Sequence, residues 1–111
     1  MTIVVHPLAQ DELRRYASGY DTAGPGVGDE MVTDFEDVIA RIAAEPTHAA
    51  DAGQGVRGVL MLRFPCVVCY VVRDDGSALI VGLNHRSDAA RAWLIGRSRR
   101  SRLVEPGERS T

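Results

Sequence analysis

The sequence contains no lysine, so all 13 of its cationic side chains are arginines. Aromatic residues make up only 5% of the 111 residues, and there are just two cysteines. No apolar run approaches the roughly 20 residues that a membrane-spanning helix needs, which argues against a membrane protein. The first residues, MTIVVHP, have neither a basic start nor a long apolar stretch, so no signal peptide is predicted. The expected compartment is the cytoplasm, where thiols stay reduced.

Charge is distributed unevenly along the chain. Residues 1–55 contain ten acidic residues and three arginines, which gives a net charge of −7. Residues 56–111 contain ten arginines and five acidic residues, which gives +5. A genome rich in G and C would explain the exclusive use of arginine through its codons. The second half also predicts a cationic face for an anionic partner, and the two explanations are compatible.

The two cysteines lie close together in the segment RFPCVVCYVV, as Cys66 and Cys69. Successive side chains of a strand point to opposite faces, so two residues that are three apart lie on opposite sides of the sheet. Their Cα atoms would be about 10 Å apart, whereas a disulfide needs less than about 7 Å. No second Cys/His cluster completes a zinc site. Both cysteines are therefore interpreted as small buried packing residues, and no metal or cofactor is expected.

Hydrophobic periodicity predicts a single α+β domain. Pro7 suits the first turn of a helix, GPGVG marks a turn between two helices, and DDGS marks a β-hairpin. The expected order is β-α-α-β-β-β-α, with strands at 2–6, 56–64, 66–73 and 78–85 and helices at 7–21, 29–45 and 89–96. The domain spans 1–96, and the polar, arginine-rich stretch 97–111 is expected to be a flexible tail. Its RSRRSR segment is either solvated or ordered by an anionic partner.

The predicted sheet is apolar on both faces. In the strand 56–64, Leu60 and Leu62 point one way, whereas Val59 and Met61 point the other. A helical hairpin packed on the small antiparallel or mixed sheet covers only one of these faces. The second face therefore needs the short third helix, a second subunit or a partner protein as its cover.

The succession of four strings resembles the RelE/ParE superfamily of toxins from bacterial type II toxin–antitoxin modules. These strings are HPLAQDEL, GPGVGDEMVTDFEDVIARIAAEP, VRGVLMLRFPCVVCYVV and LNHRSDAARAW, and the similarity covers about residues 3–97. Cys66 stands where the family pattern has tyrosine, which favours a packing role for it. The resemblance implies a helical hairpin on a small sheet, an antitoxin partner, and a role in growth inhibition and plasmid stabilisation.

The superfamily has two branches with different targets. RelE-like members cleave mRNA in the ribosomal A site, whereas ParE-like members block DNA gyrase and are no nucleases. The positions at which RelE-type nucleases carry cations are here Gly58, Leu60 and Val67, and Arg86 alone matches a catalytic arginine. A ribosome binder is also expected to be basic, whereas the isoelectric point here is 5.9. The sequence therefore favours a ParE-like toxin that acts by binding.

Three alternatives remain open at this point. The preferred one is a gyrase-binding toxin, the second is a ribosome-dependent mRNA endonuclease, and the third is an inactive member that only binds its antitoxin. The candidate catalytic residues of the nuclease are His85, Arg86 and Arg63, although His85 is better explained as a histidine at a strand end that makes one backbone hydrogen bond. The antitoxin is expected to present an acidic amphipathic segment to Arg57, Val59, Met61, Arg63, Arg73, Arg86, Arg91 and Trp93. The oligomeric state stays open between a homodimer and a hetero-oligomer with the antitoxin.

Overall fold

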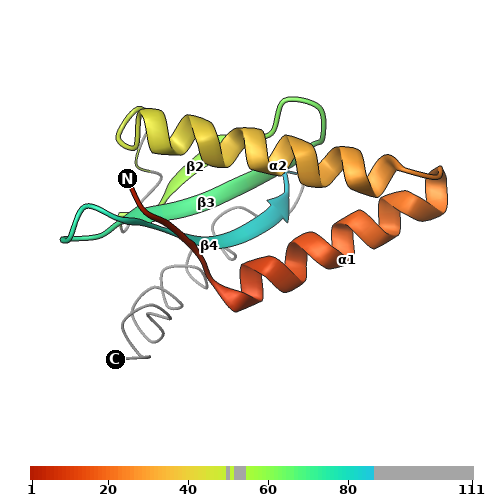
Figure 1. The fold of residues 1–111 in the computed structure, drawn as a ribbon, viewed down its shortest axis with the longest axis horizontal. Coiled ribbons are helices and arrows are strands. Elements are labelled where there is room, and N and C mark those ends of the chain that lie inside the picture. The colour runs from red at the N-terminus through yellow and green to blue at the C-terminus, as the bar shows by residue number, and fades with distance from the viewer. Residues whose placement is uncertain (50, 52–54, 87–111) are drawn as a thin grey trace.

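A computed structural model describes residues 1–49, 51 and 55–86 of the chain. The elements are β1 (Ile3–Val5), α1 (Pro7–Ala23), α2 (Val27–Ala44), β2 (Arg57–Leu60), β3 (Cys66–Val72) and β4 (Ala78–His85). Figure 1 shows α1 and α2 as a hairpin lying against the sheet. This arrangement confirms the predicted α+β class and the β-α-α-β-β-β order of its first six elements. The predicted helix 89–96 and the tail 97–111 lie outside the described residues.

The sheet is mixed, with the strand order β1-β4-β3-β2. β1 pairs with β4 in parallel, whereas β2–β3 and β3–β4 are antiparallel. Because β1 has only three residues, it pairs with β4 only from Ala78 to Ile80. The remainder of β4, as far as His85, therefore has no strand beside it on that edge within the described part of the chain.

Local sequence explains how the helical hairpin forms. Pro7 occupies the first turn of α1, and His6 accepts a hydrogen bond on Nδ1 from the Leu8 N–H at 3.1 Å. α2 begins after a turn in which Gly26 adopts a positive φ of 84°. A Cβ placed on Gly28 would lie 2.4 Å from the Ala17 carbonyl oxygen, so only glycine permits this close helix contact. The hairpin that the sequence predicted thus depends on glycine at its tip.

The hydrophobic core lies between the hairpin and one face of the sheet. It joins residues of both helices with residues of β3 and β4, including Ala9, Met31, Phe35, Val38, Ile42, Cys66, Val68, Tyr70, Ala78, Ile80 and Leu83. A second cluster, of Val56, Cys69, Leu79 and Val81, lies on the other face and contains no residue of α1 or α2. The sheet is therefore apolar on both faces, as the strand pattern predicted.

The cysteines lie as strand parity requires. Cys66 belongs to the core beneath the helices, whereas Cys69 belongs to the cluster on the opposite face. Both cysteines are buried, and neither forms a disulfide. The prediction that they pack on opposite faces, with no disulfide between them, is confirmed.

The predicted strand 56–64 is shorter in the structure and ends at Leu60. Residues 61–65 form a loop instead, because a carboxylate of α2 binds two of the N–H groups of this segment. The alternation within the segment is nevertheless as predicted. Val59 and Met61 pack against the core, whereas Leu60 and Leu62 are 48% and 69% exposed.

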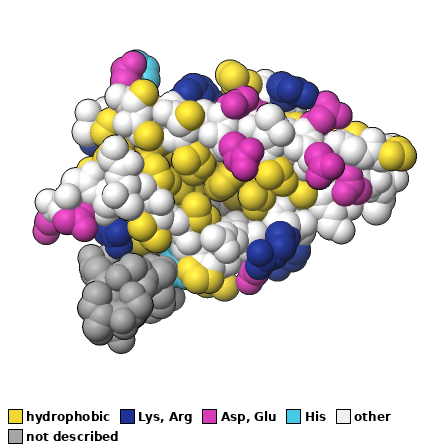
Figure 2. All heavy atoms as spheres, in the orientation of Figure 1, with side chains coloured by type: hydrophobic (Ala, Val, Ile, Leu, Met, Phe, Trp, Pro, Cys, Tyr) yellow, Lys and Arg dark blue, Asp and Glu magenta, His cyan; other side chains and the backbone are white. Residues whose placement is uncertain are grey.

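The surface of the helical side is apolar at its centre and charged around it. Figure 2 shows hydrophobic side chains gathered between α1 and α2, surrounded by many acidic side chains and several arginines. This distribution agrees with the negative charge of the first half of the sequence. None of the helices in the described part of the chain is long and apolar enough to cross a membrane.

Candidate functional site

The loop 61–65 is held by a buried carboxylate from α2. Asp34, which is 1% exposed, accepts hydrogen bonds from the N–H groups of Leu62 at 3.3 Å and Arg63 at 2.8 Å. At the base of the loop, the Met61 N–H donates to the Cys66 carbonyl oxygen at 2.9 Å. A buried carboxylate that accepts several backbone N–H groups fixes the local backbone strongly. The loop therefore has a defined conformation imposed by α2.

Two further contacts attach the same loop to α1 and to the end of β4. The Phe64 ring packs edge-on against Tyr20, with ring centroids 4.9 Å apart. The Arg86 N–H donates to the Pro65 carbonyl oxygen at 2.9 Å. This last bond brings Arg86, which follows β4, beside a loop that lies more than twenty positions earlier in the sequence.

A hollow of about 240 Å³ opens over this loop, and we call it the loop hollow. Its lining residues are Leu60, Met61, Leu62, Arg63, Phe64, Pro65 and Arg86. Arg63 pairs with Glu30 of α2 at 2.7 Å. Arg86 is exposed and forms no ion pair with any described residue. The loop hollow therefore combines exposed leucines with two guanidinium groups.

Of the three nuclease candidates, the structure brings two together and places the third, His85, apart from them. Arg63 and Arg86 both line the loop hollow, although the sequence placed them 23 positions apart. His85 lies at the end of β4 opposite Cys66, and its N–H donates to the Tyr16 hydroxyl at 3.0 Å. It is not among the residues that line the hollow. The structure thus brings together two cations of the proposed nuclease site, and the described lining residues include no histidine or carboxylate to act as a base.

The positions that carry cations in RelE-type nucleases are adjacent in the structure. Leu60 of β2 is the direct cross-strand partner of Val67 of β3, and Gly58 is the partner of Cys69. Leu60 also lines the loop hollow. The region in which the resemblance would place phosphate-binding cations is therefore apolar, apart from the arginines at its rim.

The other described residues of the predicted antitoxin surface are placed differently from one another. Met61 lines the loop hollow but is only 2% exposed, and Val59 packs half-buried against the core. Arg73 donates from Nε to the Ser77 hydroxyl at 2.9 Å within the β3–β4 hairpin. Arg91 and Trp93 lie outside the described residues. Of the arginines predicted for this surface, Arg63 and Arg86 share one hollow.

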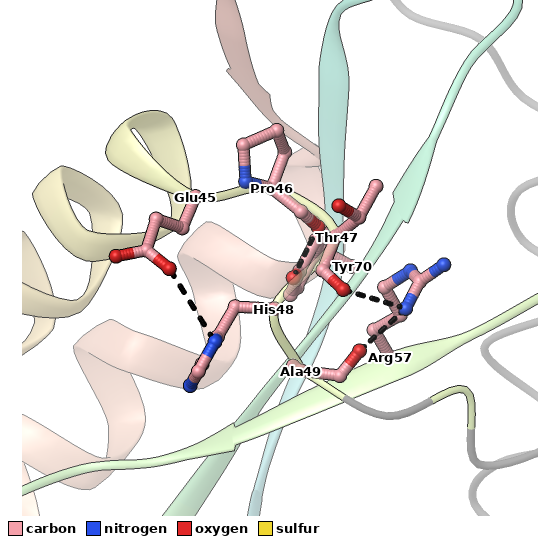
Figure 3. Close-up of polar contacts among 7 residues, drawn as sticks. All are labelled: Glu45, Pro46, Thr47, His48, Ala49, Arg57 and Tyr70. Atoms are coloured by element: carbon pink, nitrogen blue, oxygen red, sulfur yellow. Dashed lines mark hydrogen bonds and ion pairs between the residues drawn. The ribbon is translucent and has the colours of Figure 1, made fainter.

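Arg57 binds the segment that follows α2, part of which lines a second hollow, and Figure 3 shows these polar contacts. Its guanidinium donates to the carbonyl oxygens of Thr47 and Ala49, and the Tyr70 hydroxyl donates to the Pro46 carbonyl oxygen at 2.7 Å. Burial raises the pKa of the Tyr70 phenol above its usual value, while the nearby Arg57 opposes the shift. These bonds hold the segment 46–49, which follows α2, against β2 and β3.

This second hollow measures about 270 Å³, and its lining is largely apolar. The residues are Arg41, Ile42, Ala44, Glu45, His48, Ala49, Val59 and Tyr70. Glu45 and His48 lie 3.4 Å apart as a pair at its rim. The site thus has charges of both signs and gives no preference for an anionic ligand.

A third hollow, of about 290 Å³, lies beside the free edge of β4 and is lined by Glu12, Arg15, Tyr16 and Asn84. The Glu12 carboxylate accepts a hydrogen bond from the Leu83 N–H at 3.0 Å. The Tyr16 hydroxyl accepts one from the His85 N–H, two residues further along the strand. These helix side chains replace the strand that β1 is too short to supply. They block further strand addition at this edge.

The sequence interpretation did not single out Asp34, which holds the 61–65 loop, or Glu12, which binds the edge of β4. Each is an acid within the apolar stripe of its helix: Asp34 stands three after Met31, and Glu12 stands three after Ala9. An acid at a core-facing position predicts a buried hydrogen-bond acceptor, and that signal was available. Within the described residues, no group of three or more His, Cys, Asp or Glu side chains is placed to hold a metal ion.

Comparisons with known proteins find similarity among solved structures. No protein-family model matches the chain, and no curated protein matches it. Among solved structures, a chain of the "Chromosomal ParDE TA system from P. aeruginosa" is similar, with a TM-score of 0.68 and 18% sequence identity. The match covers 77% of this chain and 95% of that chain. It confirms the RelE/ParE-like fold that the four sequence strings predicted.

Proposed function

We propose that the chain is the toxin component of a type II toxin–antitoxin system and that an antitoxin neutralises it. The observation that supports this proposal is the shared fold with a chain of a ParDE system over 95% of that chain's length. The sequence strings support it independently, because they point to the same superfamily.

We further propose that the toxin acts by binding its target rather than by cleaving RNA. Metal-free RNA cleavage needs a base for the 2′-hydroxyl, cations around the phosphate and an acid for the leaving oxygen. The loop hollow offers Arg63 and Arg86, but Glu30 already pairs with the first of these. Leu60 and Val67 occupy positions at which RelE-type nucleases have cations. DNA gyrase is the proposed target.

A ribosome-dependent nuclease is the second candidate, and one observation favours it. Arg63 and Arg86 share a hollow, so two cations could engage one phosphate. His85 would then have to supply the base from outside the hollow. An inactive member that binds only its antitoxin is the third candidate.

Two assays with the purified chain separate these candidates. We expect it to inhibit supercoiling of relaxed plasmid by bacterial gyrase and to leave mRNA intact on programmed ribosomes. Codon-dependent mRNA cleavage that is lost in Arg86→Ala would establish the nuclease instead. If neither activity is observed, while the product of the adjacent reading frame still binds, the chain is the inactive member.

A further inference from the structure

The loop hollow displays apolar side chains on a rigid backbone. Leu62 is 69% exposed, although both its own N–H and that of Arg63 are bound to the buried Asp34 carboxylate. The fixed backbone therefore keeps the Leu62 side chain exposed to solvent. Leu60, at the end of β2, adds a second exposed leucine to the same hollow.

We infer that the loop hollow is the docking site for an acidic protein segment with an apolar anchor, carried by the partner that neutralises the chain. This inference rests on the proposed function and adds the place and the chemistry of the contact. The anchor side chain packs on Leu60 and Leu62, and a neighbouring carboxylate pairs with Arg86.

The apolar part of the argument follows from preorganisation. Binding loses affinity when loops and side chains must be ordered, and a surface that is already rigid avoids that cost. The 61–65 loop is ordered by α2 through Asp34, by α1 through the Tyr20 ring and by the N–H of Arg86. Exposed leucines on such a rigid loop are suited to be the central contacts of a protein–protein interface.

The charge part of the argument follows from the lining of the hollow. Its described lining residues include two arginines, Arg63 and Arg86, of which Glu30 of α2 already pairs with the first. Arg86 is exposed and forms no ion pair with a described residue, and its guanidinium is the cation that we assign to a carboxylate of the partner. A third cation lies nearby, because Arg41 donates to the Leu60 carbonyl oxygen at 3.3 Å. A partner segment with negative charge is therefore complementary to these arginines.

An RNA strand is the competing occupant, and the lining argues against it. Single-stranded nucleic acid binds through phosphate contacts combined with bases stacked on exposed aromatic rings. The aromatic ring in the loop hollow is Phe64, which is half-buried and packs against Tyr20. The exposed side chains are aliphatic, which suits a protein side chain.

The test measures binding of the full chain to the purified product of the reading frame adjacent to its own, by calorimetry at 50 mM and 500 mM salt. Leu62→Ser and Leu60→Ser remove the apolar contacts, and Arg86→Ser removes the cation. The matched controls are Leu8→Ser, an α1 leucine that is 46% exposed, and Arg14→Ser on the exposed face of α1. Thermal unfolding of every variant verifies that it is folded.

We expect Leu62→Ser to weaken binding at least about tenfold, as loss of a central apolar contact does. Arg86→Ser should weaken it several-fold at low salt and less at high salt, while both controls stay within about twofold.

Unchanged affinity in all three hollow variants, with tight wild-type binding, would overturn the inference and leave the proposed function intact. Binding of a single-stranded RNA oligonucleotide that requires Arg86 but neither leucine would replace the protein segment with RNA. No binding of the adjacent product to the wild type would overturn both proposals.

Discussion

The Asp34 carboxylate lies 2.8 Å from the backbone nitrogen of Arg63 and accepts its N–H, although 29 positions separate the two residues. Together with its bond to the Leu62 N–H, this contact ends β2 at Leu60 and turns the chain into a loop. One buried acid of α2 thus determines where the sheet stops and where two exposed leucines stand. The contact between Asp34 and Arg63 therefore determines the shape of the loop hollow.

Replacing Asp34 with Asn should destabilise the protein by about 2 kcal/mol, because one of the two N–H groups that it binds then faces the side-chain NH2 group, which donates and cannot accept. Urea denaturation measures the change. Asp37→Asn, at an exposed position one turn further along α2, is the control and should stay within about 0.5 kcal/mol. Equal stability of the two variants would show that the Asp34 contacts contribute nothing.

Tyr16→Phe should cost about 1 kcal/mol, since the His85 N–H loses its acceptor at the edge of β4. Hydrogen exchange at the His85 amide should accelerate more than exchange elsewhere in β4. Tyr20→Phe is the matched control, because its hydroxyl has no hydrogen bond among the described residues while its ring contact is kept. Unchanged exchange at His85 in Tyr16→Phe would mean that this bond does not protect the edge.

Cys66→Ser and Cys69→Ser should each lower stability by about 1–3 kcal/mol, because a hydroxyl enters a fully buried apolar site. Neither change should abolish toxicity, since the thiols lie on opposite faces and cannot act together. Denaturation and a growth assay measure the two effects. A double variant that keeps its stability but loses toxicity would assign the thiols a functional role.

The raised pKa of Tyr70 predicts a loss of stability at high pH. Its phenol titrates near 10.0 when unfolded and at higher pH when folded, because burial disfavours the phenolate and outweighs the opposing effect of Arg57. The unfolded state therefore loses its proton first, so stability falls as pH rises above about 10. Tyr70→Phe should flatten this part of the curve of unfolding free energy against pH. An unchanged slope would show that Tyr70 does not contribute to it.

Local patterns predicted the elements of this fold because each depends on nearby residues. The turn glycines and Pro7 define the helical hairpin, and strand parity placed the two cysteines on opposite faces. The predicted strand 56–64 was too long because its end depends on Asp34 in α2. A contact over such a distance in sequence leaves no local periodic signal.

The candidate site was also predictable only in part, because its residues are named by local sequence but brought together by long-range contacts. Arginine composition indicated a cationic partner surface, and the sequence named both Arg63 and Arg86 as candidates. That the two share a hollow depends on the bond between Arg86 and Pro65, which only the packed structure shows. The roles of Arg57 and Arg73 in partner binding stay predictions, although both side chains also hold local backbone or hairpin structure.

We propose that the chain is a toxin that acts by binding gyrase. Regulated expression in bacteria is the decisive measurement, with a reporter of the DNA-damage response and an assay of protein synthesis in the same culture. We expect growth arrest with early induction of the DNA-damage response while translation continues, and relief of the arrest when the adjacent reading frame is expressed as well. Early arrest of translation with mRNA cleavage, abolished in Arg86→Ala, would contradict it.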